Sequence, residues 1–335
     1  MKICELSAWG FENLHFRDVE TPQPGPDQVL LKFGAASVNY RDYQIVAGEF
    51  APTHPLPIIP GSDGAGQIVA TGDNVEGLSA GDRVSPLFFP EWMCGEALGS
   101  ERSVSSGLET PGVLREYGIY EQHQVCRVAP HLTDAEASCY PCAGLTAWNS
   151  LVTLSGIAVG NTVLVQGTGG VAIMALQMAK AMGAQLIVTS SSNDRLQRAM
   201  ALGADHGINY AETPNWGEAA RKLTDGQGVD AVIEIGGEGT LSQSISALRR
   251  GGHINVIGYL AGIGLGLSVF DLIERNANLH GLSVGNREQF EGMMDFIGKH
   301  GIRPVISRTY PFEEAGQALQ DIAEGGNFGK LVVTI

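Results

Sequence analysis

The pattern of apolar and polar residues between positions 162 and 195 predicts a strand, a turn, a helix and a second strand. Residues 162–165 (Thr-Val-Leu-Val) form a short apolar run, which is typical of a strand buried on both faces. Apolar residues then recur at helical spacing over 171–182, and Gly183 is typical of a helix end. A second apolar run at 185–189 completes a βαβ unit.

The turn of this unit carries a glycine pattern that suits a dinucleotide. Gly167 permits a tight turn with positive φ, and Gly169 has no Cβ, so a pyrophosphate can approach the backbone. The helix that follows presents unpaired N–H groups to that pyrophosphate. An ordinary βα turn is the alternative, but the strand–turn–helix context favours a nucleotide site. The candidate binding residues here are Gly167, Thr168, Gly169, Gly170 and Val171.

The end of the second strand distinguishes NAD from NADP. An NAD site usually carries a carboxylate at this position, which binds the ribose 2′-hydroxyl and would repel a 2′-phosphate. The sequence instead has Ser190, Ser191, Asn193 and Arg195, whose hydroxyl, amide and guanidinium groups suit a phosphate. These residues therefore favour NADPH. In the alternative interpretation, Ser192 or Asn193 only caps the helix 195–202 and Arg195 is solvated.

The alternation of strand and helix patterns continues to residue 284. We expect strands at 203–210, 229–235, 253–259 and 278–284, separated by helices at 216–223 and 241–249. Such alternation predicts a parallel, doubly wound α/β sheet, whose ligand lies at the carboxyl ends of the strands. This geometry adds four candidate cofactor residues, namely Gly236, Gly258, Tyr259 and Val284.

The first 126 residues show a different sequence pattern, in which short stretches typical of strands are separated by glycine and proline. We expect a hairpin over 3–20, with its turn near residues 10–13, and strands near 28–37, 61–69 and 81–84. A helix that ends near residue 323 and a final strand complete the chain. These patterns predict a compact β-rich domain.

Composition and charge narrow the classes of partner. With 44% hydrophobic and 17% charged residues, the chain of 335 residues resembles an ordinary globular protein and is long enough for two domains. A net charge of −15 argues against nucleic acid and anionic membranes as partners. No apolar run is long enough to span a bilayer, and residues 1–16 lack the apolar core of a signal peptide. Five scattered cysteines favour a reducing, cytoplasmic location.

Several motifs together resemble the medium-chain dehydrogenase/reductase superfamily. They are residues 61–69, 81–84 and 141–147 and the glycine turn, in matching order and spacing. The resemblance implies a GroES-like catalytic domain, residues 1–126 and 287–335, and a Rossmann NADP-binding domain, residues 127–286. It also implies that Thr146 contacts the nicotinamide, and that the chain forms a homodimer through the cofactor domain near residues 262–270. Tyr210 resembles a tyrosine that packs near the adenosine phosphate, although a capping aromatic is an equal alternative.

The resemblance also bears on metal binding. Zinc alcohol dehydrogenases of this superfamily hold catalytic zinc with Cys, His and Cys, which align here with Asn39, Ser62 and Cys142. Hydroxyl and amide groups bind zinc poorly, so we expect no metal. The loop that would hold a structural zinc contains one cysteine, Cys94. The pair Cys139 and Cys142 is interpreted as buried thiols.

With these substitutions at the zinc-ligand positions, the chain resembles the zinc-free quinone oxidoreductase and enoyl reductase branches of the superfamily. NADPH then delivers hydride to a quinone or an α,β-unsaturated carbonyl, and the candidate catalytic residues are Asn39, Tyr40, Tyr43 and Asp63. Asn39 either donates an amide hydrogen to a substrate carbonyl or orients its loop. Tyr40 and Tyr43 are either proton donors or packing residues, and Asp63 takes the place of an acid of the zinc enzymes.

Two other functions fit the same residues. One is an alcohol dehydrogenase or carbonyl reductase with a non-metal proton donor. The other is a non-catalytic NADPH-binding protein that acts as a sensor or structural component.

Overall fold

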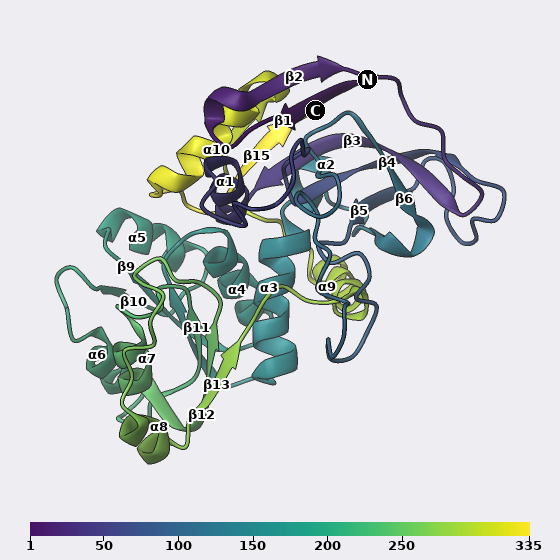
Figure 1. Ribbon diagram of the computed structural model, residues 1–335. Helices are drawn as coiled ribbons and strands as arrows, with labels where there is room; N and C mark the ends of the chain where they lie inside the picture. The colour runs from purple at the N-terminus through teal and green to yellow at the C-terminus, as the bar shows by residue number, and fades with distance from the viewer. The chain divides into compact units, whose positions relative to one another are not determined.

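The computed structural model of the protein describes residues 1–335 and divides them into two compact units (Figure 1). Unit 1 comprises residues 1–145 and 284–335, and unit 2 comprises residues 146–283. The α/β class predicted from the sequence, with a β-rich unit and a parallel-sheet unit, is confirmed. The boundaries differ from the expected ones, because residues 127–145 and 284–286 lie in unit 1 rather than with the cofactor-binding half.

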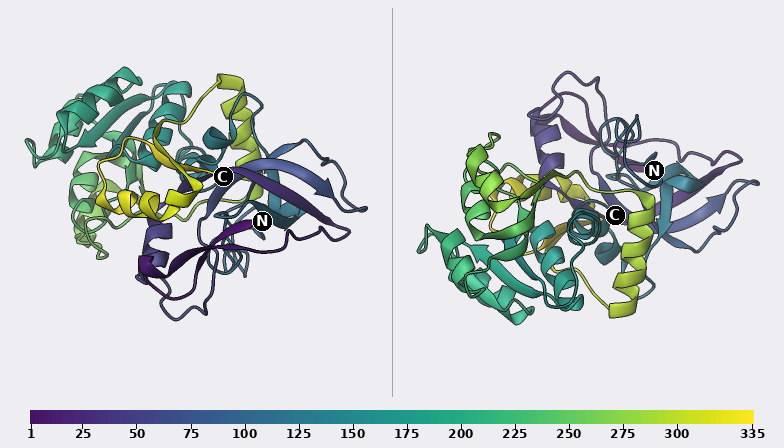
Figure 2. Two further views of the ribbon diagram at one scale, coloured as in Figure 1. Left: turned by 90° about the horizontal axis from the view of Figure 1, so that it is seen from above. Right: turned by 90° about the horizontal axis from the view of Figure 1, so that it is seen from below.

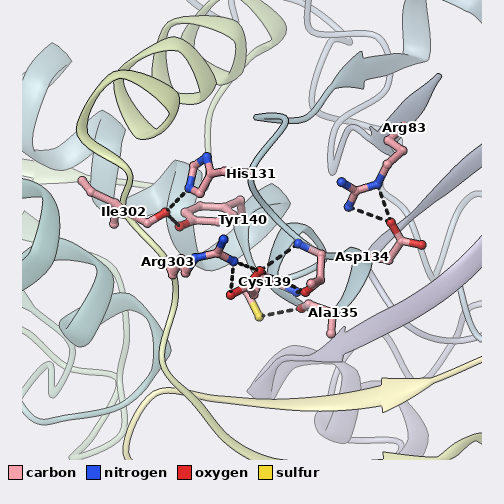
Figure 3. Close-up of polar contacts among 10 residues, drawn as sticks. Arg83, His131, Asp134, Ala135, Cys139, Tyr140, Ile302 and Arg303 are labelled. Carbon is pink, nitrogen blue, oxygen red and sulfur yellow. Dashed lines mark hydrogen bonds and ion pairs between the residues drawn. The ribbon is translucent and has the colours of Figure 1, made fainter.

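Polar contacts explain why residues 127–145 belong to unit 1 (Figure 3). The Arg83 guanidinium donates two hydrogen bonds to Oδ1 of Asp134, at 2.9 and 2.8 Å. The carbonyl oxygen of Ile302 meets Nε2 of His131 at 2.9 Å and accepts from the Tyr140 hydroxyl at 3.4 Å. These partners come from both halves of unit 1, and side-chain contacts between distant segments leave no local pattern in the sequence.

Unit 1 is built on a seven-stranded sheet with the order β14-β15-β3-β4-β5-β7, in which β6 also pairs with β3. Only β14 and β15 run parallel, and the other pairs are antiparallel. The long strand β3 is the centre of the sheet because it pairs with β15, β4 and β6, and most of its residues are buried. The strands are β3 (Gln28–Val38), β4 (Asp63–Thr71), β5 (Arg83–Pro86), β6 (Tyr117–Glu121), β7 (Val125–Arg127), β14 (Ile306–Pro311) and β15 (Lys330–Thr334).

A separate hairpin and four helices complete unit 1. The expected hairpin is confirmed as β1 (Lys2–Leu6) and β2 (Leu14–Asp18), joined through the turn η1 (Phe11–Asn13). Both termini belong to this unit and lie near each other in the views of Figures 1 and 2. The helices are α1 (Tyr40–Ala47), α2 (Asp134–Ala137), α9 (Arg287–His300) and α10 (Ala315–Glu324). Of these, only α10 was predicted from the sequence; α1 was expected to be part of a loop, and α2 and α9 were not predicted.

Unit 2 contains a fully parallel six-stranded sheet with the order β10-β9-β8-β11-β12-β13. In this doubly wound order, the strands are added first to one side of β8 and then to the other, so the strand order reverses between β8 and β11. All residues of β8 are buried, as the apolar run predicted. The strands are β8 (Thr162–Gln166), β9 (Gln185–Ser190), β10 (His206–Asn209), β11 (Val229–Glu234), β12 (Leu248–Val256) and β13 (Asn278–Gly281).

Helices flank this sheet on both faces (Figure 1). They are α4 (Gly170–Ala181), α5 (Asn193–Ala201), α6 (Trp216–Lys222), α7 (Leu241–Ala247) and α8 (Val269–Arg275). The segment that leads into the sheet contains η3 (Tyr140–Gly144), α3 (Leu145–Trp148) and η4 (Asn149–Leu154), in which both η segments have wide, π-type turns. No helix in the protein is both long and apolar enough to cross a membrane.

Besides β10, which begins at His206 rather than at 203, and β12, which covers Leu248–Val256 rather than 253–259, two expected elements of unit 2 end at different residues. Helix α7 stops at Ala247, and the next residue, Leu248, already starts β12, because Leu248 pairs with Val229 of β11. Strand β13 stops at Gly281, so Val284 does not end a strand but begins the return to unit 1, with a positive φ of 54°. Strand pairing across the sheet sets both ends.

Candidate cofactor and catalytic sites

The candidate cofactor residues of unit 2 gather at one edge of the parallel sheet. Adjacent strands are in register there, with Gln166 of β8 opposite Thr189 of β9, and Ser190 opposite Asn209 of β10. Glu234, the last residue of β11, lies opposite Val256 of β12. The residues that follow these strand ends therefore line the carboxyl edge, where doubly wound sheets bind their ligands.

The glycine turn has the geometry that a pyrophosphate requires. Gly167 has a φ of 73°, which residues with a side chain rarely adopt. At Gly169, which caps α4, a Cβ would meet no atom within 4 Å, so the backbone faces open space. The N–H groups of the first turn of α4 lie next to this opening and favour an anion. The turn thus fits the cofactor that the sequence predicted.

Arg195 forms a polar group with the two serines at the end of β9. Its Nε donates to Oγ of Ser190 at 3.3 Å, and a terminal nitrogen donates to Oγ of Ser191 at 3.0 Å. Ser192 caps α5, because its Oγ accepts from the backbone N–H of Arg195 at 3.4 Å. The capping alternative is therefore also true, but it uses the backbone of Arg195 and leaves the guanidinium beside the two hydroxyls.

Tyr210 follows β10 on the same edge. Its backbone N–H donates to the carbonyl oxygen of Ser190 at 3.1 Å, and its ring is 44% exposed. The exposed ring is available to a bound adenosine. The residue also stands at the end of the strand. Tyr259 is exposed to a similar degree beyond β12, whereas Thr146 is buried at the start of unit 2. Gly258 must lack a side chain, because a Cβ there would lie 2.6 Å from the carbonyl oxygen of Ile235.

A buried carboxylate that the sequence interpretation missed supports this edge. Glu234 is fully buried, and its Oε2 accepts a hydrogen bond from Nε2 of Gln166 at 2.6 Å and another from Ser244. Its Oε1 accepts from the backbone N–H groups of Gly236 and Gly237, at 2.8 and 3.1 Å, and from the Thr240 hydroxyl. Glu234 thus joins β8 to β11 and shapes the turn at Gly236. The signal was available, because an acid directly follows the apolar residues Ala231, Val232 and Ile233 at the end of the strand.

In unit 1, Asn39 lies at the junction of β3 and α1. Its side-chain nitrogen donates to Oγ of Ser62 at 3.1 Å and to Oδ2 of Asp63 at 2.9 Å. Its side-chain oxygen accepts from Nζ of Lys330 at 2.5 Å. Both amide hydrogens are therefore used inside the protein, which supports the orienting role of Asn39 over donation to a substrate carbonyl.

Asp63 and Asp42 are completely buried next to Asn39. Burial raises the pKa of Asp63 to about 7, although the ammonium of Lys330, 3.8 Å away, opposes the shift. Burial also raises the pKa of Asp42, whose Oδ2 accepts from the backbone N–H of Asn39 and whose Oδ1 accepts from Ser62. Without solvent contact, Asp63 acts on a ligand only through Asn39, whose side-chain nitrogen donates to it.

The two candidate phenols stand in different surroundings. The Tyr43 ring stacks on Phe11, with ring centroids 5.7 Å apart, and lies against Tyr40 at the same distance. Tyr40 is the more open of the two, with 37% of its surface exposed. Proton donation by either residue remains a prediction, and the packing favours Tyr40.

Arg41 ties the long segment 88–116 to α1. Its guanidinium donates to the carbonyl oxygen of Ser106 at 3.0 Å and to Oγ of Ser105, and it lies 5.0 Å from the centroid of the Phe88 ring. The segment contains neither helix nor strand, as expected of a loop. Side-chain contacts to the helix that carries Tyr40 thus help to hold it, together with backbone hydrogen bonds from Arg287 and Glu288 to Trp92 and Met93.

Comparisons with known proteins agree with this architecture. Residues 25–130 match the family described as alcohol dehydrogenase GroES-like domain, and residues 170–299 match the family described as zinc-binding dehydrogenase. A zinc-type alcohol dehydrogenase-like protein of Schizosaccharomyces pombe is 40% identical over 97% of this chain and 96% of its own. The chain belongs to the medium-chain dehydrogenase/reductase superfamily.

Other members of the superfamily match over nearly the whole chain. A Sinorhizobium meliloti 1021 protein, provisionally described as an alcohol dehydrogenase, has a crystal structure with a TM-score of 0.91 and 38% identity, covering 99% of both chains. The human quinone oxidoreductase is 27% identical over 95% of this chain and 92% of its own. Proteins described as alcohol dehydrogenases and as quinone oxidoreductases thus both occur among the superfamily members that are similar to this chain.

The zinc implied by one family description does not fit the residues of this superfamily member. The three positions that align with zinc ligands hold an amide (Asn39), a hydroxyl (Ser62) and the thiol of Cys142, whose pKa is raised by burial. The oxygen atom of the Asn39 amide faces the ammonium of Lys330, and a cation repels a metal ion. Zinc needs deprotonated thiolates, imidazoles or carboxylates in a tetrahedral set, and this group does not supply one.

One acidic residue near the adenosine end was missed by the sequence interpretation. Oε1 of Glu212 accepts from the side-chain nitrogens of Asn193 at 2.8 Å and Asn209 at 3.0 Å. Asn193 is therefore held by Glu212 and Asn209 rather than by Arg195. Because Glu212 lies beyond β10, outside the position where an NAD-type acid is expected, only the folded chain reveals it.

Proposed function

We propose that this superfamily member is an NADPH-dependent oxidoreductase that works without zinc and transfers hydride to a quinone or an α,β-unsaturated carbonyl. The observation that carries the proposal is the group around Asn39, where an amide and a hydroxyl stand at the positions of two zinc ligands and a buried ammonium binds the amide oxygen. Without a metal to ionise an alcohol, an acceptor that is already activated is the better substrate. The relationship to the human quinone oxidoreductase supports the same substrate class.

The choice of NADPH rests on Arg195. Its guanidinium lies beside the hydroxyls of Ser190 and Ser191, and together they offer the charge and donors that a 2′-phosphate needs. Bound NADPH supplies the hydride. The chain binds the pyrophosphate at Gly169 and the first turn of α4, and it holds Asn39, Asp63 and Lys330 as one hydrogen-bonded group.

A second candidate is an alcohol dehydrogenase or carbonyl reductase of the same superfamily. The names of the Schizosaccharomyces pombe and Sinorhizobium meliloti proteins favour it. It requires a proton donor other than a metal-bound group, and Tyr40 is the more exposed phenol. A non-catalytic NADPH-binding protein is the remaining possibility.

An acceptor panel separates these functions. The purified protein is mixed with NADPH and, in turn, with quinones, enones and aldehydes, and the absorbance of the reduced nicotinamide is followed. We expect turnover with quinones or enones and little with aldehydes. Oxidation of alcohols with NADP⁺ at alkaline pH would favour the dehydrogenase, and tight NADPH binding without any turnover would favour a sensor.

We also propose that the protein forms a homodimer through unit 2. An exposed apolar surface follows β12 and continues along α8, and its members are 58–89% exposed. Apolar surface of this kind is typical of protein–protein contacts. The surface consists of Leu260, Ile263, Leu265, Val269, Phe270 and Ile273.

A further inference from the structure

Lys330, the first residue of β15, is a buried lysine outside the candidate residues considered from the sequence. It is 3% exposed, and its Nζ donates to the carbonyl oxygen of Val38 at 2.9 Å and to Oδ1 of Asn39 at 2.5 Å. Its third neighbour is Oδ2 of Asp63, at 3.8 Å. A buried ammonium is costly unless it is paired and hydrogen-bonded, so this arrangement needs all three partners.

Just as the buried ammonium of Lys330 needs partners, the buried carboxylates around it need a cation. Asp63 and Asp42 are both fully buried, and Oδ1 of Asp63 has no hydrogen-bond partner. Arg41 is the other cation that acts on Asp42, but its guanidinium points to Ser105 and Ser106. Lys330 is thus the cation that faces Asp63.

The ammonium also determines which way the Asn39 amide points. The amide oxygen faces Lys330, and the amide nitrogen faces the Asp63 carboxylate. A reversed amide would place its hydrogens against the ammonium and its oxygen against the carboxylate, so both contacts would become repulsive. The pair Lys330 and Asp63 therefore fixes Asn39 electrostatically from two sides.

We propose that Lys330 is a positioning residue that serves as the internal cation of this site, where it neutralises Asp63 and holds the Asn39 amide. Its ammonium lies against Asn39, the residue that aligns with the first zinc ligand of the zinc alcohol dehydrogenases. The inference rests on the proposed zinc-free function, since a bound metal would compete with the ammonium. The charged and titratable groups around Asp63 are Lys330 from β15, Asp42 from α1, and the thiols of Cys139 and of Cys142 from η3, and Arg41 from α1 acts on Asp42 and Cys142.

The test is a double-mutant cycle on the full-length protein, with melting temperature measured from pH 5.5 to 8.5. The variants are Lys330→Met, which removes the charge, Lys330→Arg, which keeps it, Asp63→Asn, and the double variant Lys330→Met/Asp63→Asn. Lys2→Met is the matched control, because Lys2 pairs with Glu313 at 2.8 Å on the surface of the same unit.

We expect Lys330→Met to lower the melting temperature by roughly 5–15 °C at pH 8, as removal of one partner of a buried pair does. The double variant should lose clearly less than the sum of the two single losses, because the uncharged amide introduced by Asp63→Asn no longer needs a cation. Lys330→Arg should retain part of the wild-type stability. Lys2→Met should change the melting temperature by about 1 °C or less, as exposed pairs do.

The pH series separates an electrostatic role from simple packing. The pKa of Asp63 is higher in the folded protein than in the unfolded chain, so the stability that this carboxyl contributes is present at low pH and is lost as pH rises through about 7. Without Lys330 the pKa rises further and the loss continues to higher pH. The difference between wild type and Lys330→Met should therefore widen from pH 5.5 to 8.5, whereas that of Lys2→Met should stay constant.

Additive losses in the cycle, or a difference that does not depend on pH, would overturn the proposal. If Lys330→Met does not fold, the test uses Asp63→Asn alone. The melting temperature of this variant should fall less than that of the wild type between pH 5.5 and 8.5. An unchanged slope would then contradict the proposal. A full equivalent of zinc in the wild-type protein would instead refute the proposed function, and the cycle would still report separately on Lys330.

Discussion

The Nε2 atom of Gln166 donates a 2.6 Å hydrogen bond to Oε2 of Glu234, and this bond joins the carboxyl ends of β8 and β11. These are the two strands between which the sheet reverses its winding. A buried carboxylate without partners would weaken the interior of a sheet, but both oxygens of Glu234 accept hydrogen bonds. The pair thus adds a buried side-chain link to the backbone pairing of these strands at the cofactor edge.

Replacement of Glu234 by Ala should therefore be severe. The change leaves five donors without their acceptor, so we expect a loss of about 3–5 kcal/mol in the free energy of unfolding, measured by urea denaturation. NADPH affinity should fall as well, because the Gly236 turn loses its anchor. Glu238→Gln, an exposed change nearby, is the control and should cost about 0.5 kcal/mol or less. A small effect of Glu234→Ala would show that the network is not structural.

Arg195→Ala should weaken NADPH much more than NADH. Loss of charge-assisted hydrogen bonds to a phosphate costs about 1.5–3 kcal/mol, which corresponds to roughly 10- to 100-fold in the NADPH dissociation constant. NADH lacks the 2′-phosphate and should lose about 3-fold or less. Fluorescence titration of both cofactors measures this, with Arg198→Ala on the same helix as the control. Equal losses for both cofactors would contradict the phosphate assignment.

Glu212→Gln examines the acid that the fold brings to Asn193, two residues before Arg195. Because Oε1 of Glu212 is held by Asn193 and Asn209, we expect the change to leave NADH affinity within about 2-fold and to favour NADPH slightly through reduced repulsion. The same titration provides the measurement. A 10-fold or larger loss of NADH affinity, about 1.4 kcal/mol, would identify Glu212 as a ribose ligand and refute the choice of NADPH.

Metal removal should have no effect on this protein. We expect elemental analysis to find far less than one zinc per chain, and prolonged treatment with EDTA to leave NADPH-dependent reduction unchanged. The reason is the donor set, in which Asn39 and Ser62 replace two ligands that zinc binds well. The control is a zinc-dependent alcohol dehydrogenase treated in parallel, which should lose activity. Recovery of activity by added zinc would contradict the assignment.

Phe270→Glu should prevent dimer formation. Phe270 lies on α8 in the exposed apolar surface, and a carboxylate there cannot be buried against a second copy without a large desolvation cost. Light scattering after gel filtration should show two chains for the wild type and one for the variant. Val159→Glu, at an exposed position outside that surface, should remain dimeric. A monomeric wild type would refute the proposed assembly.

Local patterns predicted much of this protein. The apolar run of β8, the glycine turn and the helical spacing of α4 reflect interactions within a few residues, so they can be recognised without the fold. The same holds for Ser192, which caps α5, and for the alternation that predicts a parallel sheet. The missing zinc ligands were also visible, because chemical identity does not depend on the fold.

Tertiary structure alone decided the rest, because it depends on residues that are far apart in the chain. Lys330 reaches Asn39 across 291 positions, and Gln166 reaches Glu234 across 68. The same is true of Glu212, which an intervening strand and turn bring back to Asn193. Sequence patterns report the local geometry of a backbone, whereas the pairing of buried charges follows from which strand ends the folded sheets place together.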